Sequence, residues 1–558
     1  MFKRTAFSLP GSFTTNATTV PRRLFQAALA VASAAFAPTL FAQVTSATWT
    51  DGGADGSWGN TANWSTGVVP AALDADVVID GNADNVAGFM TLNKAHRLAG
   101  LITLTGSAEK YIWASSPGEG YTSARRLQIG SGITMDATSG TAFIGYADDP
   151  ALGRVAARAV ATQTWRNESS NDLNFGRPVT RANATASGSL IAGFFGPSPR
   201  PDVTLTLDAA GSGNIVLNGS MNNGYTPAVG ETGLAVAIDS QGTGFVYFNN
   251  AVSHTGGTVV RNGTLAIGNG STDAGFVIGD VVVEQGGALI IDQPAGTTYF
   301  VGSSVPDNIY MTNVSGAGPL TLRGGATFEV IGPATNTGGT TVAGGTAVLK
   351  SGGSLAGPVT LSAGGGLTVD AGLSKSLDSL NLAGGLLDVG SGRLEIATGG
   401  ISESALRTAL QEGRNGGGWD GSTGVTSAAA AVSSGSRAVG YLVAGDGTTT
   451  VAFAAPGDTS LDGQVDNFDL IAMSTSEKFG TGQPASWAQG DANYDGVFNL
   501  ADLVLVDAAG VYGQGPYLAT QPASITAVPE PGTCGLLAAL AGLAAFAINR
   551  RERSRDAA

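Results

Sequence analysis

The chain has 558 residues, of which 84 are glycine and 13% are charged, and its formal net charge is −15. With 28 Lys and Arg against 43 Asp and Glu, the chain lacks the basic side chains that hold phosphates, which argues against a nucleic-acid partner. The richness in glycine and small residues favours many short strands and turns. The single cysteine, Cys534, excludes disulfide bonds within the chain as a source of stability.

The first 42 residues are ordered like a secretory signal peptide. Four basic residues precede a small, apolar run over residues 24–40, and the sequence that follows predicts cleavage after Ala42. The basic residues are Lys3, Arg4, Arg22 and Arg23. Twin-arginine export and an uncut N-terminal anchor are the alternatives to ordinary secretion. We therefore predict an exported protein whose mature chain begins near Gln43.

Residues 43–98 are expected to form an N-terminal β cap. Trp49, Trp58 and Trp64 are predicted to cover the end of a sheet stack, whereas exposed indole rings that stack on sugars are the alternative. Alternating apolar residues predict a first strand over 74–79. The spacing of the tryptophans resembles the start of proteins that carry autotransporter-associated β-strand repeats.

Residues 99–400 are a succession of short apolar runs broken by glycine pairs. The run 255–267 returns as 337–349, and both copies begin with Thr-Gly-Gly-Thr. Later glycine pairs fall 20 residues apart, at 344–345, 364–365 and 384–385. A period of about 20 residues suits one coil of a β-solenoid, in which alternate side chains are buried and each coil stacks on the next.

These copies resemble the autotransporter-associated β-strand repeat, with its G-G-T-x-V…G-T-L core. The resemblance implies a right-handed parallel β-helix over this part of the chain. An antiparallel array of β-sandwiches is the alternative fold.

Catalytic residues are scarce along this predicted solenoid. His96 and His254 are the only histidines, and neither is near a Ser or Cys motif. His254 lies at the position that Asn336 holds in the second repeat copy, where a turn residue is expected. We therefore predict that the protein is not an enzyme. A pair of Asp or Glu residues from distant coils, as in a polysaccharide lyase, is the alternative.

Residues 401–455 are predicted to join the solenoid to a C-terminal module. Apolar residues four positions apart predict a short helix over 402–410, and strand-like runs follow at 438–443 and 448–453. With the Gly-Gly-Gly-Trp-Asp-Gly sequence between them, these elements resemble a joining region found before dockerin-like modules. We expect a structural role for it.

Two twelve-residue loops, at 458–469 and 491–502, carry the clearest chemistry in the chain. Each has oxygen side chains at positions 1, 3, 5, 9 and 12, glycine at position 6, and at position 7 a residue that would offer its backbone carbonyl. This spacing wraps hard oxygen ligands round one Ca²⁺ ion, so we predict two calcium ions and a helix after each loop. The predicted ligands are Asp458, Ser460, Asp462, Gln464, Asp466, Asp469, Asp491, Asn493, Asp495, Val497, Asn499 and Asp502.

The tandem loops resemble a type I dockerin over residues 456–515, because each has Asp at position 12 and is followed by one helix. The resemblance implies a cohesin-like partner. No cohesin or catalytic domain is visible in the sequence, which favours the alternative role of a calcium-folded stalk. Since the clustered carboxylates repel one another without the ion, we expect folding of this module to be coupled to calcium binding.

After a linker over 516–527, the tail has three parts in order. Val528-Pro529-Glu530-Pro531 precedes an uncharged apolar run, and basic residues close the chain. The run predicts a transmembrane helix over 534–549, with a weak anchor as the alternative because the run is short. By the positive-inside rule the basic residues stay cytoplasmic; they include Arg550, Arg551 and Arg553.

The order of these parts resembles the PEP-CTERM tail of bacterial envelope proteins over residues 528–558. The resemblance implies an inner-membrane stage and cleavage by an exosortase near the Pro-Glu-Pro motif.

We therefore predict a mainly β chain: a parallel β-solenoid, a small α-helical calcium module and a C-terminal membrane anchor. The predicted function is that of an exported cell-surface or extracellular-matrix structural or adhesion protein, stabilised by calcium. A polysaccharide-binding or polysaccharide-degrading β-helix, docked through the dockerin-like module, is the alternative.

Overall fold

The computed structural model describes residues 46–80, 89–92, 96–114, 125–145, 155–176, 190–191, 202–223, 233–272, 274–302 and 311–517. The predicted signal peptide and the predicted sorting tail, with its transmembrane helix and basic flank, lie outside the described residues. Every helix within these ranges falls short of the length and hydrophobicity that a membrane span requires.

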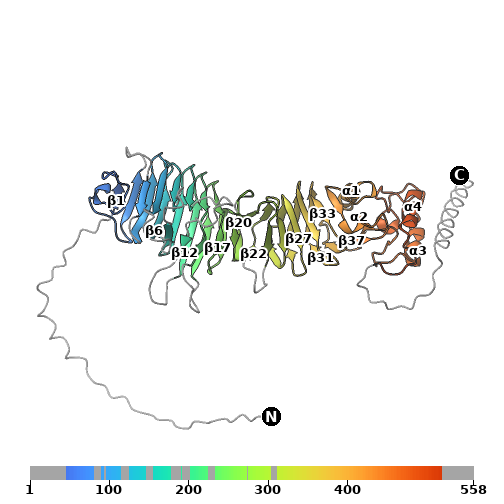
Figure 1. Cartoon of the computed structure of the whole chain (residues 1–558). Coiled ribbons are helices and arrows are strands. Elements are labelled where there is room, and N and C mark those ends of the chain that lie inside the picture. Colours follow the sequence, from blue (N-terminus) through green and yellow to red (C-terminus); the bar gives the residue numbers. More distant parts are fainter. Residues whose placement is uncertain are drawn as a thin grey trace, which may run out of the picture. The chain divides into compact units, whose positions relative to one another are not determined.

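Short strands that stack in chain order are the commonest elements of the described chain (Figure 1). Twenty-nine of the described strands form one sheet in which neighbours pair in parallel. The first strands are β1 (Ser46–Trp49), β2 (Asp76–Asp80), β3 (Phe89–Leu92), β4 (His96–Thr105), β5 (Lys110–Ala114), β6 (Arg125–Met135), β7 (Ala142–Ile144), β8 (Val155–Ala159), β9 (Gln163–Asn167), β10 (Leu173–Phe175), β11 (Leu190–Ile191), β12 (Val203–Ala209), β13 (Ile215–Leu217), β14 (Met221–Asn222), β15 (Leu234–Asp239), β16 (Phe245–Phe248), β17 (Ala251–Ser253), β18 (Thr258–Ile267) and β19 (Phe276–Val277).

The following strands continue the stack toward the C-terminus. They are β20 (Gly279–Asp292), β21 (Thr298–Val301), β22 (Met311–Gly316), β23 (Leu320–Arg323), β24 (Thr327–Val330), β25 (Pro333–Asn336), β26 (Thr340–Val342), β27 (Gly345–Leu349), β28 (Ser354–Leu355), β29 (Pro358–Ser362), β30 (Gly365–Val369), β31 (Ser374–Leu377), β32 (Ser379–Ala383), β33 (Leu386–Asp388) and β34 (Arg393–Ile396). The parallel pairing rules out the antiparallel sandwich array, because such an array would pair its strands in the opposite sense.

Three strands make one coil in the C-terminal half of the stack. β26 pairs with β29 and β29 with β32, while β27 pairs with β30 and β30 with β33. Ala347, Leu367 and Leu387 are stacked partners 20 residues apart, which confirms the predicted coil length. Coils nearer the N-terminus are longer, since Trp165 stacks on Leu207. Their extra residues lie between strands, so the glycine spacing does not reveal them.

A column of buried side chains runs through the coils and forms the core. Parallel strands lie about 4.8 Å apart, so side chains in register stack directly on one another. Each buried aliphatic side chain contributes about 1.5–3 kcal/mol relative to exposure. One such column consists of Ala47, Val77, Ile102, Ile133, Trp165, Leu207, Ile238, Val260 and Val283.

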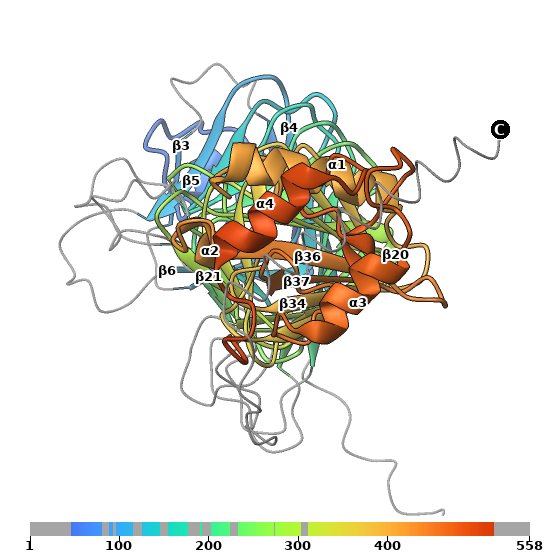
Figure 2. The same ribbon diagram turned by 90° about the vertical axis from the view of Figure 1, so that its right-hand side faces the viewer.

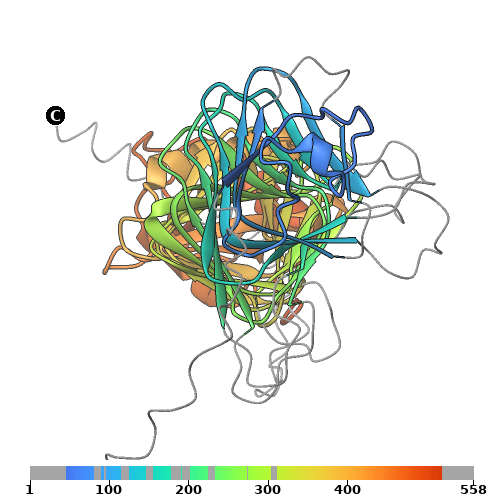
Figure 3. The same cartoon turned by 90° about the vertical axis from the view of Figure 1, so that its left-hand side faces the viewer.

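Three tryptophans pack together at the N-terminal end of the column. Figure 3 views the strand stack from this end, with the first described residues in blue. Trp49 and Trp58 both contact Trp64 edge to face, with ring centroids 5.1 and 5.0 Å apart, and all three are buried. Their burial is what the predicted capping role requires, and it leaves no exposed indole face on which a sugar could stack. The first strand is β1 rather than the predicted strand over 74–79, which corresponds to β2 and pairs with it.

The C-terminal elements end the stack and differ from it (Figure 2). β35 adds to β33 in parallel, whereas β37 pairs antiparallel with both β34 and β36. The helix predicted over 402–410 is present as α1, and Ser402 caps it. The elements are α1 (Glu403–Arg414), β35 (Gly424–Thr426), α2 (Ala428–Ala431), β36 (Ala438–Val443), β37 (Thr449–Ala454), α3 (Asn467–Thr475) and α4 (Leu500–Ala509), with short 3-10 turns at Thr61–Asn63 (η1), Asn415–Gly417 (η2) and Trp487–Gln489 (η3).

Replacing His254 by Asn is expected to remove an acid sensitivity of the stack. His254 is buried beside Thr258, and burial lowers its pKa to about 4 from an ordinary value of 6.5. Between these values the unfolded chain takes up a proton that the folded chain excludes. The free energy of unfolding therefore falls as the pH drops from about 6.5 to about 4, by roughly 3 kcal/mol from this group.

Urea unfolding of the wild type and His254→Asn near pH 7 and near pH 4.5 measures this difference. Asn is the natural replacement, because Asn336 holds the equivalent repeat position and donates from Nδ2 to the carbonyl of Gly339 (2.8 Å). An equal loss of stability in both proteins on acidification would contradict the assignment.

Candidate metal centre

Each predicted calcium loop runs directly into a helix, and its last residues form the helix cap. Asp466 and Asn499, at position 9, accept hydrogen bonds from the amides two residues later, both at 2.7 Å. Asp469 and Asp502, at position 12, accept from the position-9 amides at 3.0 and 2.8 Å. These reciprocal bonds are capping boxes, which explains why α3 and α4 begin where they do. The position-9 side chains therefore cap helices, a role that the predicted ligand set did not include.

The position-12 carboxylates also tie the end of each loop to its beginning. Oδ1 of Asp469 accepts from the amides of Thr459 (2.9 Å) and Ser460 (3.2 Å). In the second loop, Oδ1 of Asp502 accepts from the amides at positions 2 and 3, at 3.0 and 3.1 Å. Each loop is thus closed on itself by one buried carboxylate.

The position-1 carboxylates lie at the centre of the loops. Asp458 and Asp491 are both fully buried, and each accepts a hydrogen bond on Oδ2 from the position-6 glycine amide, at 3.1 and 3.0 Å. Gly463 and Gly496 both have φ of 88°, which glycine adopts without the strain that a Cβ atom would bring. The predicted sharp turn at position 6 is therefore present in both loops.

The two position-1 carboxylates differ in how well they are satisfied. Oδ2 of Asp458 also accepts from the hydroxyl of Tyr517, and its Oδ1 accepts from Oγ of Ser460 (3.3 Å). Oδ1 of Asp491 is buried and has no hydrogen-bond partner. A buried acceptor without a donor is costly, so this oxygen is a position where a bound cation would stabilise the loop.

Burial shifts the ionisation of all four carboxylates upward. It raises the pKa of Asp458 to about 6 and that of Asp491 to about 7, and the neighbouring Asp502 adds to the second shift. Burial likewise raises the pKa values of Asp469 and Asp502. The loops hold these groups where their charged form is disfavoured, and a divalent cation would reverse that preference.

The fit to calcium rests on the whole set of oxygen atoms in each loop. In the ranges that the structure covers, no three Asp, Glu, His or Cys side chains lie close enough together to surround one ion. A calcium loop also uses amide, hydroxyl and backbone oxygens, and hard oxygens of this kind are what the loops offer. The bare Oδ1 of Asp491 fits a cation. The other predicted ligands, Asn493, Asp495, Asp502 and the carbonyl of Val497, would have to close round the ion, because the carboxylates do not surround one point as they stand.

Asp491→Asn is expected to abolish binding at one of two calcium sites. The amide would remove a negative charge from the oxygen that lacks a partner, and we expect at least a tenfold loss of affinity at that site, about 1.4 kcal/mol. Calorimetric titration with calcium measures the number of ions and their affinities. Asp507→Asn is the matched control, because Asp507 is exposed on α4 outside the loop. Equal binding by the two variants would exclude Asp491 as a ligand.

A loop near the N-terminus, which the sequence analysis missed, shares two backbone-to-carboxylate hydrogen bonds and one left-handed residue with the predicted calcium loops. Gly56 donates to Asp51 Oδ1 (3.0 Å) and Ser57 to Asp55 Oδ1 (3.0 Å), as the amides at positions 6 and 7 do in both predicted calcium loops. Ala54 has φ of 54°, beside 58° and 68° at position 4 of those loops. The Asp-Gly-Gly-Ala-Asp-Gly sequence at 51–56 was the available signal.

In this N-terminal loop, the Asn63 amide takes the part of the position-12 carboxylate, although it stands one residue further along, at position 13. Oδ1 of Asn63 accepts from the amide of Gly53 (2.7 Å), the bond that Asp469 and Asp502 make in their loops. Its Nδ2 donates to Oδ1 of Asp55 (2.7 Å) and to the carbonyl of Ser57 (2.9 Å). We infer that the Asn63 amide satisfies the oxygens that would otherwise face a cation.

Asn63→Asp is therefore expected to give the N-terminal loop a calcium dependence that it lacks in the wild type. The change removes two hydrogen-bond donors and adds a third carboxylate beside Asp51 and Asp55. Calcium titration should then count one more ion than in the wild type. Thr61→Asp is the control, since it adds a negative charge at an exposed position two residues before Asn63. If both variants bind alike, the interpretation of Asn63 is wrong.

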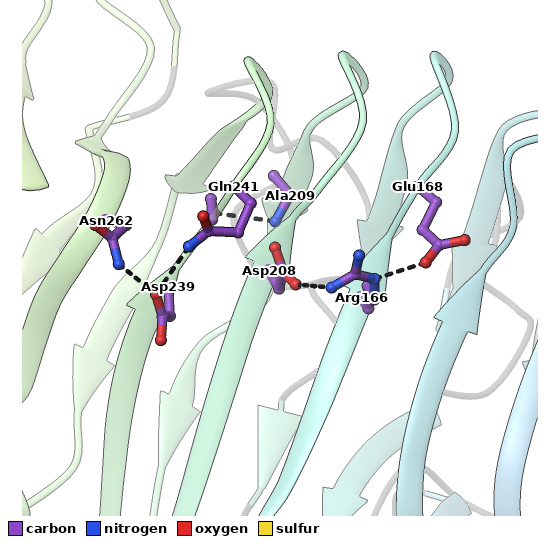
Figure 4. Close-up of polar contacts among 8 residues, drawn as sticks. Arg166, Glu168, Asp208, Ala209, Asp239, Gln241 and Asn262 are labelled. Carbon is purple, nitrogen blue, oxygen red and sulfur yellow. Dashed lines mark hydrogen bonds and ion pairs between the residues drawn. The ribbon is translucent and has the colours of Figure 1, made fainter. Parts of the chain in front are cut away.

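A polar ladder crosses neighbouring coils on the outside of the stack (Figure 4). Arg166 lies between Asp208 (Nη1 to Oδ2, 2.5 Å) and Glu168 (Nε to Oε1, 2.7 Å). One coil further, Asp239 accepts from Asn262 (2.7 Å). Burial raises the pKa of Asp208. The ladder thus places Asp208 and Asp239 on neighbouring coils, whereas the enzymatic alternative expects an acidic pair from distant coils. The arginine is already paired to two carboxylates.

Comparison with known proteins identifies the tail. Residues 527–551 match the family described as PEP-CTERM protein-sorting motif. The predicted sorting signal is therefore confirmed, and the chain is an exported protein that is membrane-associated for sorting and processed by an exosortase. Neither curated proteins nor solved structures give a match to the chain.

Proposed function

We propose that the protein is a structural or adhesion component of the cell surface or extracellular matrix, with a calcium-stabilised C-terminal module. The buried, unpartnered Oδ1 of Asp491 carries the calcium part of this proposal. The sorting motif supports it, because the motif directs the chain to a compartment where modules of modest calcium affinity are used. The two ions would be held by the loops at 458–469 and 491–502.

The resemblances seen in the sequence belong to this proposal. The stacked parallel strands favour autotransporter-associated repeats over 99–400, and the paired loop-helix units favour a dockerin-like module over 456–515. Residues 401–455 would be the joining segment and 43–98 the cap. These assignments describe a stalk that presents its module outside the cell.

A docking role for the module is supported by its exposed apolar side chains. Phe468 and Ile471 on α3 are 78% and 56% exposed, and Leu500 and Val504 on α4 are 66% and 58% exposed. Large apolar residues in such positions are typical of protein interfaces. A cohesin-like partner would account for them.

A polysaccharide-active role is the second candidate, and the polar ladder is the feature that would serve it. Asp208 and Asp239 would be its acidic pair, with Arg166 beside them. Arg166 is held by salt bridges to two carboxylates, which favours a structural role for the ladder. We therefore retain the non-enzymatic function as the proposal.

Calcium titration of the mature chain, residues 43–526, tests the proposed function. We expect two ions to bind and the helical circular dichroism signal to rise, because binding removes the repulsion between the loop carboxylates. Chelation should lower the unfolding temperature of the module. Magnesium at equal concentration is the control, since Mg²⁺ demands a smaller and more regular set of ligands. A chain that binds no calcium at all would refute this proposal.

A further inference from the structure

The calcium loops lie directly against the last elements of the strand stack. The first four residues of β36, 438–441, are buried. Gly440 among them has no room for a side chain: a Cβ atom there would lie 2.3 Å from Cδ2 of Leu461 and 2.8 Å from Nε1 of Trp487. Figure 2 shows α3 and α4 in front of β36 and β37 at this end of the stack. Leu461, Trp487 and Tyr494 belong to the same buried apolar cluster as the coils.

Tyr494 makes the most extensive of these contacts. Its side chain is fully buried, and its hydroxyl donates to the carbonyl of Val439 on β36 (2.5 Å). Its own carbonyl accepts from Nε2 of Gln411 on α1 (2.6 Å). Its ring is stacked on Trp487 at 5.7 Å and meets Trp419 edge to face at 5.9 Å. One loop residue therefore contacts β36, α1 and the segment at Trp419, all of which lie at the end of the stack.

Leu461 and Tyr494 hold the same position, the fourth, in their two loops. Both have left-handed backbone conformations, with φ of 58° and 68°. Such a conformation is unfavourable for a side chain of this size, so the surrounding loop must impose it. The position-1 carboxylates impose it by binding the position-6 amides, and the same carboxylates are the predicted calcium ligands.

We propose that the two calcium loops are the C-terminal cap of the strand stack, and that calcium binding holds this cap closed. The inference rests on the proposed calcium function and adds the surface that the module recognises, which is the end of its own stack. An ion that fixes the loops also fixes Leu461 and Tyr494 against β36. By thermodynamic linkage, contacts at β36 must then strengthen calcium binding by the same factor.

This reciprocity distinguishes a cap from a module that is merely tethered. Gln411 lies on α1, outside both loops, and carries no charge. If the module were tethered, loss of this side chain would leave calcium affinity unchanged. If the module is a cap, Gln411→Ala removes a hydrogen bond that the closed state needs, and calcium affinity falls.

Two variants and one control test the proposal by calorimetric calcium titration of the mature chain. Tyr494→Phe removes the bond to Val439 and keeps the ring, and we expect it and Gln411→Ala each to lower calcium affinity about three- to tenfold. Tyr111→Phe is the matched control, because it removes a hydroxyl that donates to Glu109 (2.6 Å) at β5, outside both loops. Its calcium affinity should stay within about twofold of the wild type.

Amide hydrogen exchange provides the reciprocal measurement. Addition of a chelator should raise exchange over 438–443 and 424–426 as well as over 457–517, while the coils over 340–369 stay protected. Increased exchange confined to 457–517, together with wild-type calcium affinity of both variants, would overturn the cap and leave the calcium function standing. Absence of calcium binding by the wild type would instead refute the proposed function itself.

Discussion

A stack of parallel strands has two open ends, and each end exposes a cross-section of the apolar core. Along the stack, each coil covers the one before it, so buried columns such as the one from Ala47 to Val283 need no further protection. At the ends there is no next coil. The described parts of the chain depend on how these two cross-sections are covered, because uncovered strand edges and apolar side chains invite association.

The two ends are covered by similar means. At the N-terminal end, three tryptophans lie over the first coil beside a loop that is locked by the Asn63 amide. At the C-terminal end, Trp419, Trp487 and Tyr494 lie against β36. The two ends of the stack differ in the side chain that closes each loop. It is the amide of Asn63 at the N-terminal end, and the carboxylates of Asp469 and Asp502 at the C-terminal end. An amide supplies its own donors, whereas under the proposed function the buried carboxylates would be neutralised by a cation.

This difference fits the destination that the sorting motif indicates. A chain that leaves the cytoplasm without disulfide bonds must draw its stability from packing and from ions available outside the cell. Burial of the four loop carboxylates raises their pKa values. In the metal-free loop, the ionised form of these groups is therefore unfavourable. Under the proposed function, a bound calcium ion would favour the ionised carboxylates and stabilise the loops outside the cell.

Several features followed from the sequence because they depend on local patterns. The 20-residue glycine spacing predicted the coil length over 340–388, and the Asp and Gly spacing predicted the loop turns and the starts of α3 and α4. Such patterns fix backbone turns and alternate burial through neighbouring residues alone. The sorting tail could likewise be predicted from the sequence, because its signal is the order of three short segments.

Other features were decided by the tertiary structure. The pairing of β1 with β2, the polar ladder of Arg166 and Asp208, and the contact of Tyr494 with Val439 join residues that are distant in sequence. Where the coils differ in length, the sequence has no constant spacing from which the pairing of strands could be predicted. The strands can still stack in register, because the extra residues lie between them. The sequence by itself therefore determined the repeating strands, the loops and the sorting signal. Only the folded chain decided which side chains meet across coils and that the loops pack on the end of the stack, because packing depends on residues brought together in space.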